Sequence, residues 1–241
     1  MKLSTTYDDL NALFINCTLK KDEASHTDTL LTISQTIMNK QGVSTELIRP
    51  TNYSIAFGMK PDMTEHGWET DDWPEIQKKV MAADIVVIGS PIWLGVKSSV
   101  ASMVIERLYS NSSKTNDRGQ YLYYGKTAGC LVTGNEDGAK AVAMETLYAM
   151  AHIGFMIPPQ PDAGWIGEAG PGPSYGDQTE GSDVPAGFDN DFTNMNTTFM
   201  TWNLLHTARW LKDSGGFPAY GNVASEWQNG QRFGFELPNS T

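Results

Sequence analysis

Short apolar segments alternate with helix-like segments along much of this 241-residue chain, and this alternation restricts the possible folds more than any other feature. Residues 84–89 read Asp-Ile-Val-Val-Ile-Gly, and residues 10–16 form another short apolar run without polar alternation. Such runs are expected for strands that are covered on both faces. We therefore predict strands at residues 10–16, 43–49, 84–89, 126–133 and 155–157. Helices are predicted at residues 27–41, 73–83, 97–109, 139–152 and 193–212.

Helices between successive strands predict right-handed crossovers and therefore a parallel sheet. Five strands with four intervening helices fit a doubly wound α/β fold, in which a five-stranded parallel sheet is the middle of three layers. We expect the chain to form one domain over residues 1–241. Its parts would be a core at 10–157, a Gly- and Pro-rich loop at 158–192, and a C-terminal helix and tail at 193–241.

The loop at 158–192 is longer than an ordinary connection, so it is either a disordered linker or a functional loop. Its aromatic residues Trp165, Tyr175 and Phe188 argue against a free linker, which would avoid such side chains. We expect a lid or a subunit contact. Trp165 or Tyr175 would then reach over a ligand of the same or a neighbouring subunit, or pack beneath their own loop.

The charge distribution disfavours some partners. The chain has 28 acidic and 17 basic residues, a formal net charge of −11, and no Lys or Arg between Lys140 and Arg209. Such a surface repels phosphate backbones and anionic membranes, so neither nucleic acid nor a membrane is an expected partner. Cys17 and Cys130 are too few for a disulfide framework and no secretory signal is visible, so a cytoplasmic protein is expected.

The loop after the first predicted strand has the residue types that bind phosphate. It ends at the start of a helix, where free N–H groups and the helix dipole favour an anion. The hydroxyl groups that would add to this site belong to Thr18, Ser25 and Thr27, and Lys20 would supply a cation. The alternative is that Ser25 is only the N-cap, with Asp28 completing a capping box. Both can hold at once, because a capped helix end is also an anion site.

Two further loops follow the third and fourth predicted strands. The first suits a flat apolar ligand, on which Trp93 would stack, and consists of Ser90, Pro91, Ile92, Trp93, Leu94 and Gly95. The second presents backbone groups suited to the edge of a heterocycle and consists of Thr133, Gly134, Asn135, Glu136, Asp137 and Gly138. The alternatives are a core-facing turn for the first loop and an ordinary βα turn capped by Asp137 for the second. Because parallel strands end at the same edge of a sheet, we expect all three loops to meet there.

These three loops resemble those of the flavodoxin-like superfamily, and more narrowly those of the NAD(P)H-dependent FMN reductases and the tryptophan-repressor-binding-protein-type quinone oxidoreductases. Residues 90–95 match the family's second loop closely, and the resemblance covers residues 10–157. It differs at Cys17, which stands where the family has its first loop glycine, and in the greater length of that loop. The resemblance implies a flavodoxin-like sandwich. It also implies FMN. The isoalloxazine would lie at residues 91–95 and 133–138, and the phosphate would be held by Thr18, Lys20, Ser25, His26 and Thr27.

The resemblance further implies an FMN-dependent oxidoreductase that passes reducing equivalents from NAD(P)H to a quinone-like or other small acceptor. Catalytic side chains are not expected, because the flavin carries the chemistry. The four histidines (His26, His66, His152 and His206) are scattered, so no metal site is predicted. Two alternatives remain: an electron carrier of the flavodoxin type, and a flavin-free nucleotide-binding regulatory domain. A homodimer or homotetramer is expected.

Overall fold

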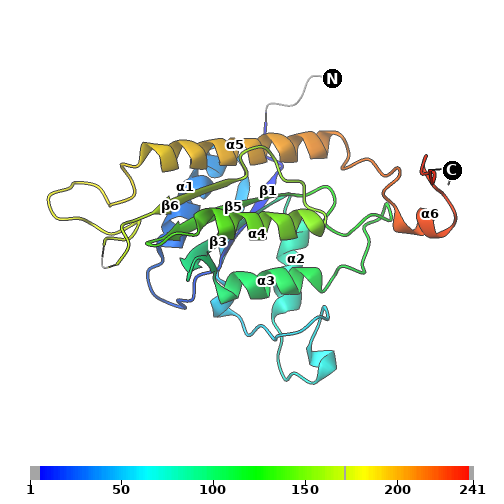
Figure 1. Ribbon diagram of the computed structural model, residues 1–241, viewed down its shortest axis with the longest axis horizontal. Helices are drawn as coiled ribbons and strands as arrows, with labels where there is room; N and C mark the ends of the chain where they lie inside the picture. The colour runs from blue at the N-terminus through cyan, green and yellow to red at the C-terminus, as the bar shows by residue number, and fades with distance from the viewer. Residues whose placement is uncertain (1–5, 171, 239–241) are drawn as a thin grey trace.

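A parallel sheet organises the molecule, which the computed structural model describes over residues 6–170 and 172–238 (Figure 1). Its five main strands run in the order β2-β1-β3-β5-β6, and a short sixth strand, β4, pairs with β3 in the antiparallel direction. The strands are β1 (Asn11–Asn16), β2 (Ser44–Ile48), β3 (Ile85–Trp93), β4 (Val96–Lys97), β5 (Thr127–Gly134) and β6 (Asp162–Ile166). The predicted five-stranded parallel sheet is thus confirmed.

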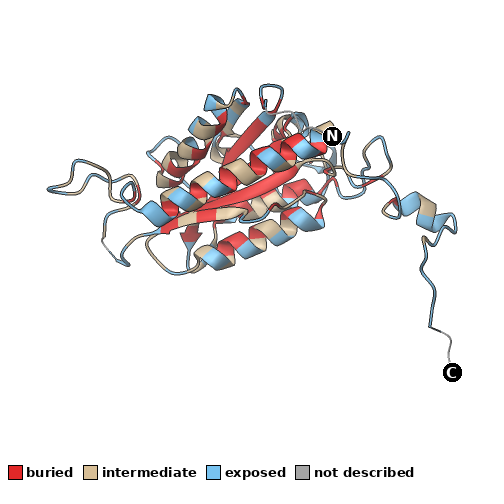
Figure 2. Cartoon of the chain, turned by 90° about the horizontal axis from the view of Figure 1, so that it is seen from above, coloured by how far each residue is buried: buried red, intermediate tan, exposed pale blue. Residues whose placement is uncertain are grey.

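Helices cover both faces of the sheet (Figures 1 and 2). One face carries α1 (His26–Lys40) and α5 (Asp191–Asp213), and the other carries α2 (Trp73–Ala82), α3 (Ser99–Tyr109) and α4 (Ala139–His152). Short helical segments complete the structure: η1 (Pro50–Asn52), η2 (Thr64–His66) and α6 (Ala224–Gln228). Within the described ranges, none of these helices combines the length and the apolar character needed to cross a membrane.

Alternate residues of the central strands supply the two halves of the core. On β1, Leu13 and Ile15 pack with α2 and α3, whereas Phe14 packs with α1 and α5. All three side chains are buried. Val86 and Val87 on the neighbouring strand β3 are buried as well. A strand that is buried on both faces reads as a continuous apolar run, which is why these strands were recognisable in the sequence.

The last strand was predicted in the wrong place. Residues 155–157 are not a strand, and Met156 makes only an isolated bridge to Thr127. Pro158 and Pro159 follow, and proline has no N–H group to donate to a ladder. The position beside β5 is taken instead by β6, with Cys130 opposite Asp162 and Gly134 opposite Ile166. Part of the predicted 158–192 loop is therefore a sheet strand.

The third helix also begins later than predicted. Trp93 pairs with Val96 across a tight turn, so residues 96–97 belong to a β3–β4 hairpin rather than to a helix. The turn residues Leu94 and Gly95 have φ values of 50° and 79°, which is the left-handed conformation of two-residue hairpins. The helix α3 then starts at Ser99, where the Ser98 side chain accepts a hydrogen bond from the N–H of Ala101.

The register brings the carboxyl ends of the strands together. Asn16 at the end of β1 lies opposite Gly89 of β3, and Thr133 of β5 lies opposite both Pro91 and Trp165. Loops that leave these strands therefore start side by side at one edge of the sheet.

We predict that Gly89→Ala destabilises the protein by about 1–3 kcal/mol, because the added methyl group overpacks the contact between β3 and α1. A Cβ at position 89 would lie 2.6 Å from Cδ1 of Leu31 and 2.9 Å from Cγ2 of Thr27. Urea unfolding measures the effect. The exposed edge-strand substitution Ser44→Ala is the control and should change stability by less than about 0.5 kcal/mol. Equal stabilities of the two variants would contradict this account of the contact.

Candidate functional site

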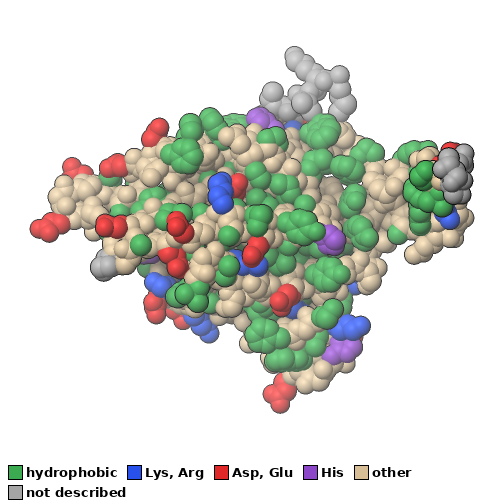
Figure 3. Space-filling model, in the orientation of Figure 1, with side chains coloured by type: hydrophobic (Ala, Val, Ile, Leu, Met, Phe, Trp, Pro, Cys, Tyr) green, Lys and Arg blue, Asp and Glu red, His purple; other side chains and the backbone are tan. Residues whose placement is uncertain are grey.

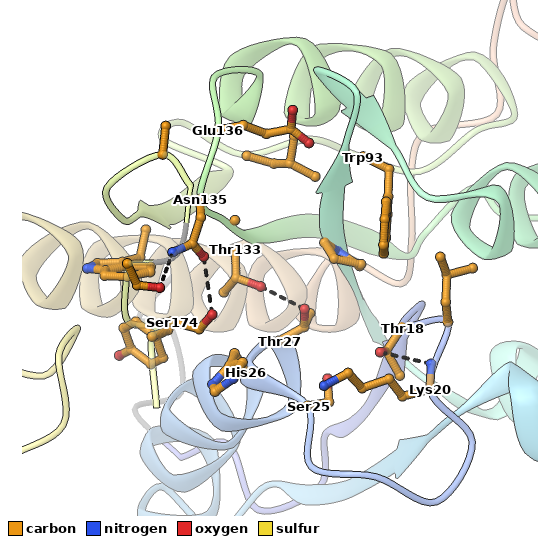
Figure 4. Close-up of a pocket in the computed structure, with 18 of the residues that line it drawn as sticks. Thr18, Lys20, Ser25, His26, Thr27, Trp93, Thr133, Asn135, Glu136 and Ser174 are labelled. Atoms are coloured by element: carbon orange, nitrogen blue, oxygen red, sulfur yellow. Dashed lines mark hydrogen bonds between the residues drawn. The ribbon is translucent and has the colours of Figure 1, made fainter. Parts of the chain in front are cut away.

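A cavity of about 720 Å³ opens at the carboxyl edge of the sheet (Figure 4). All the predicted binding residues line it except Leu94, Gly95, Asp137 and Gly138. The predicted residues that line it are Thr18, Lys20, Ser25, His26, Thr27, Pro91, Ile92, Trp93, Thr133, Gly134, Asn135 and Glu136. Lining residues that were not predicted as ligand contacts are Leu19, Trp165, Ala169, Gly170, Gly172, Ser174 and Tyr175.

The N-terminus of α1 forms one end of the cavity. Ser25 is the N-cap, as the alternative interpretation of this loop predicted, and its Oγ accepts a hydrogen bond from the N–H of Asp28 at 3.3 Å. The Asp28 carboxylate accepts from the Asn16 amide at 3.0 Å and lies 3.5 Å from Arg49. The first N–H groups of a helix have no partner within the helix. Those of His26 and Thr27 therefore remain suited to an anion.

Lys20 supplies a cation beside this helix end. Its Nζ donates to the carbonyl of Ala24 at 3.2 Å, and its backbone N–H donates to Oγ1 of Thr18 at 3.3 Å (Figure 4). The ammonium group also lies 3.9 Å from the Glu23 carboxylate. This contact is an exposed one, worth less than about 1 kcal/mol, so the lysine can exchange it for a bound anion at little cost.

Two threonines connect the helix end to the centre of the sheet. Thr27 on α1 and Thr133 on β5 share a 2.7 Å hydrogen bond between their hydroxyl groups, and both side chains are buried (Figure 4). This bond fixes the first turn of α1 against the end of β5. It thus sets the spacing between the N-terminus of α1 and the loop that follows β5.

The β3–β4 hairpin forms an apolar wall. Ile92 is buried, whereas Trp93 is 52% exposed and faces the cavity (Figure 4), so the predicted core-facing turn is wrong for Trp93. Leu94 donates its N–H to a Glu136 carboxylate oxygen at 2.9 Å.

The two glycines that do not line the cavity explain how close these loops lie. A Cβ at Gly138 would come within 2.4 Å of the Gly95 carbonyl oxygen. Gly95 and Gly138 therefore allow loop-to-loop contact rather than an approach to a ligand. Gly138, with φ of 131°, is also the N-cap residue of α4, so the predicted Asp137 cap is wrong.

Residues 167–170 and 172–176, which we call the roof, lie over the cavity and are fixed by Asn135. The Asn135 amide donates to the carbonyls of Pro173 at 3.0 Å and Gly172 at 3.3 Å. Its side-chain oxygen accepts from the Ser174 hydroxyl at 3.2 Å (Figure 4). These bonds occupy the Asn135 side chain, so at this position only backbone groups remain for a ligand.

His26 fixes the other end of the roof. Its Nδ1 accepts the Gly176 N–H at 3.0 Å, which places the proton of a neutral ring on Nε2. That nitrogen lies 3.5 Å from the Asp177 carboxylate. His26, the first residue of α1, thus holds the roof in place through Gly176, which lies 150 residues later in the chain.

Trp165 and Tyr175 are buried beside this chain's own cavity and pack against residues of their own loop, as the packing alternative predicted. Their rings meet edge to face at 5.7 Å, and Tyr175 also contacts Phe188 at 5.5 Å. Burial raises the pKa of the Tyr175 phenol to about 12, so it is neutral at physiological pH. Among the described residues, no group hydrogen-bonds its hydroxyl.

The two thiols lie outside the cavity lining and are buried and unpaired. Burial raises the pKa of the Cys17 thiol far above its usual value and that of Cys130 to about 12. Both therefore stay protonated, whereas a nucleophilic cysteine must ionise. The cavity offers binding groups instead: hydrogen-bond donors at the N-terminus of α1, and aromatic side chains of Trp93, Trp165 and Tyr175 in its walls.

Comparison with known proteins identifies the family. The NADPH-dependent FMN reductase family matches residues 10–168. The chain is 34% identical over 212 residues to the 8-demethyl-8-aminoriboflavin-5'-phosphate synthase of Streptomyces davaonensis, a match covering 85% of this chain and 79% of that protein. It is also 56% identical over 207 residues to a Mycobacterium bovis protein named divalent metal cation transporter MntH. That match covers 86% of this chain but only 30% of the length of the relative.

Solved structures that are similar to this chain agree with this family assignment. The structure of RosB with bound 8-demethyl-8-formylriboflavin-5'-phosphate superposes with a TM-score of 0.78 at 31% identity, covering 96% of this chain and 91% of that one. The Trp repressor binding protein from Bacillus subtilis gives a TM-score of 0.51 at 11% identity, covering 80% and 97% of the respective chains. The second likeness supports the fold alone.

We predict that Asn135→Ala loosens the roof without unfolding the protein. Losing the Asn135 bonds removes about 1 kcal/mol or more from the roof, so local opening should increase about tenfold. Limited proteolysis followed by mass spectrometry measures cleavage within 167–176. Asn203→Ala is the control, because Asn203 likewise donates to a backbone carbonyl, that of Pro159, outside the cavity. Equal cleavage in the two variants would show that Asn135 does not fix the roof.

Proposed function

The chain belongs to the NADPH-dependent FMN reductase family, and on this premise we propose that it is an FMN-dependent oxidoreductase using NAD(P)H. The reducing equivalents would pass through the flavin to a small acceptor such as a quinone. The observation that carries the proposal is the 720 Å³ cavity, which combines a helix N-terminus with walls that include Trp93, Trp165 and Tyr175.

The residues of the cavity fit FMN. The hydroxyls of Thr18 and Ser25, the N–H groups of His26 and Thr27 and the Lys20 ammonium group have the donor chemistry of a phosphate site. A planar ring system would occupy the other end, between Trp93, Trp165 and Tyr175. FMN, when bound, supplies hydride and single-electron transfer.

The protein itself positions the ring and limits access of water. The bond between Thr27 and Thr133 fixes the distance between the two ends of the cavity. Asn135 and His26 fix the roof. A side chain that acts as nucleophile is not required, because group and electron transfer belong to the cofactor.

A second candidate treats the flavin phosphate as the substrate rather than as a recycled cofactor. The observation that favours it is the resemblance to RosB over 96% of this chain at 31% identity, with a flavin derivative bound in that structure. In this case the same cavity would bind FMN for modification of its ring. The electron-carrier alternative requires neither NAD(P)H turnover nor a modified flavin.

We also propose a homo-oligomer in the cytoplasm, with no nucleic-acid or membrane partner. The net charge of −11 supports the last point, because a surface of that sign repels phosphate groups. The buried, unpaired thiols of Cys17 and Cys130 agree with a reducing compartment. A single-domain organisation of residues 1–241 remains part of the same proposal.

We predict that Lys20→Met weakens FMN binding roughly 10–100-fold, because it removes a charge-assisted hydrogen bond worth about 1.5–3 kcal/mol. Binding of riboflavin, which lacks the phosphate, should stay unchanged. Flavin fluorescence titration measures both affinities. The neighbouring exposed Lys21→Met is the control and should leave both intact. An equal loss of FMN and riboflavin affinity in Lys20→Met would contradict a phosphate role.

We predict that the FMN-bound protein oxidises NAD(P)H in the presence of a quinone without any partner reductase. Absorbance of NAD(P)H measures turnover, and mass spectrometry of the extracted flavin shows whether FMN is unchanged. Turnover with intact FMN supports the reductase. A flavin of altered mass supports the second candidate. Absence of turnover until a partner reductase is added supports an electron carrier and overturns the reductase proposal.

A further inference from the structure

His26 holds the roof through a hydrogen bond that depends on the protonation state of its ring. Its Nδ1 accepts the N–H of Gly176 at 3.0 Å. Histidine is the side chain whose ordinary titration falls between about pH 5 and 8. A protonated ring carries N–H groups on both nitrogens, so neither nitrogen can accept a hydrogen bond. The bond between His26 and Gly176 therefore exists only while the ring is neutral.

Gly176 lies so close to the first turn of α1 that the two N–H groups would face each other after protonation. A Cβ at Gly176 would lie 3.2 Å from Nδ1 of His26 and 3.3 Å from Oγ1 of Thr29. Only 28% of the His26 side chain is exposed, so water has limited access to this contact. A polar group that loses its partner in such a place is costly. Protonation of His26 thus destabilises the closed position of the roof.

Asp177 is the charged group that contacts the ring, and it acts in the opposite direction. Its carboxylate lies 3.5 Å from Nε2 of His26 and would attract a protonated ring. This attraction is weak, because the Asp177 side chain is 49% exposed and water screens such ion pairs. The other carboxylate oxygen already accepts the N–H of Ser174 at 2.8 Å. The lost bond with Gly176 therefore outweighs the attraction to Asp177.

The other charged groups on the neighbouring elements have partners of their own. They are Asp28 on α1, which pairs with Arg49, Lys20 and Glu23 in the loop before α1, which pair with each other, and Glu136 after β5, which accepts the N–H of Leu94. Acidic side chains gather on the segment that follows the roof, at the left of Figure 3. Within the described part of the chain, no Lys or Arg forms an ion pair with Asp177. A protonated ring is thus free to turn toward Asp177.

We propose that the roof opens when His26 takes up a proton, which frees Gly176 and leaves the ring beside Asp177. The neutral ring closes the roof, and the protonated ring opens it. His26 is then a positioning residue, because its side chain acts on the cavity through the roof. Tyr175, which lines the cavity, directly precedes Gly176, so opening should speed the exchange of a bound ligand. That this ligand is FMN rests on the proposed function.

The test is limited proteolysis of the roof in the FMN-bound full chain between about pH 5.5 and 8, with the products identified by mass spectrometry. His26→Asn is the reference variant, because its side-chain oxygen can replace Nδ1 as the acceptor but does not titrate. Comparing both proteins at each pH cancels the pH dependence of the protease. The wild type should be cleaved as fast as His26→Asn at about pH 8 and about tenfold faster at about pH 5.5.

Two further variants separate the titration of His26 from other effects of acid. His26→Ala lacks the acceptor, so it should be cleaved about tenfold faster than His26→Asn at every pH. His152 is an exposed histidine at the end of α4, so His152→Asn should keep the wild-type dependence on pH. A constant ratio of wild-type to His26→Asn cleavage overturns the proposal. So does a ratio of His26→Ala to His26→Asn cleavage that rises in acid as much as the wild-type ratio, because another group would then control the roof.

The dissociation rate of FMN, followed by flavin fluorescence, connects the roof to the cavity. Relative to His26→Asn, the wild type should release FMN about tenfold faster at about pH 5.5 and equally fast at about pH 8. Equal release rates of the two proteins at both pH values overturn the role of the roof in ligand exchange. If the chain binds no FMN, the proposed function fails, and proteolysis of the unliganded chain still decides whether His26 controls the roof.

Discussion

The parallel register of the central strands is the constraint on which the rest of the structure depends. It places Asn16 beside Gly89, and Pro91 beside Thr133, so that loops far apart in sequence begin at one edge. The missing side chain at Gly89 then lets the first turn of α1 lie directly on β3. A helix N-terminus consequently faces the same space as the β3–β4 hairpin and the end of β5, and a cavity lined by both polar and aromatic side chains results.

Residues in the cavity lining divide into those that face a ligand and those that shape the space for it. The side chain of Thr27 is hydrogen-bonded to Thr133, and the side chains of Asn135 and His26 are hydrogen-bonded to the roof. A hydrogen-bonded polar side chain that is shielded from water, as Thr27 is fully and Asn135 and His26 are in part, keeps its neighbours in one arrangement. The dimensions of the cavity are therefore set by residues that, in the sequence, resemble ligand contacts.

The roof connects the site to the edge of the sheet. It follows β6 directly, and β6 is an edge strand. A groove of about 340 Å³ on the molecular surface is lined by the same strand and by the start of α5.

The sequence by itself determined the layers, the parallel sheet and most of the cavity. Buried strands such as residues 84–89 read as continuous apolar runs, and loops after parallel strands must share an edge. Only the tertiary structure decided the position of β6, since residues 162–166 carry no local strand pattern and pair because β5 offers an open edge. The tertiary structure alone also showed that His26 accepts a hydrogen bond from Gly176, which is 150 residues away in the chain. Such a contact depends on how distant segments pack, and it leaves no periodic pattern in the sequence.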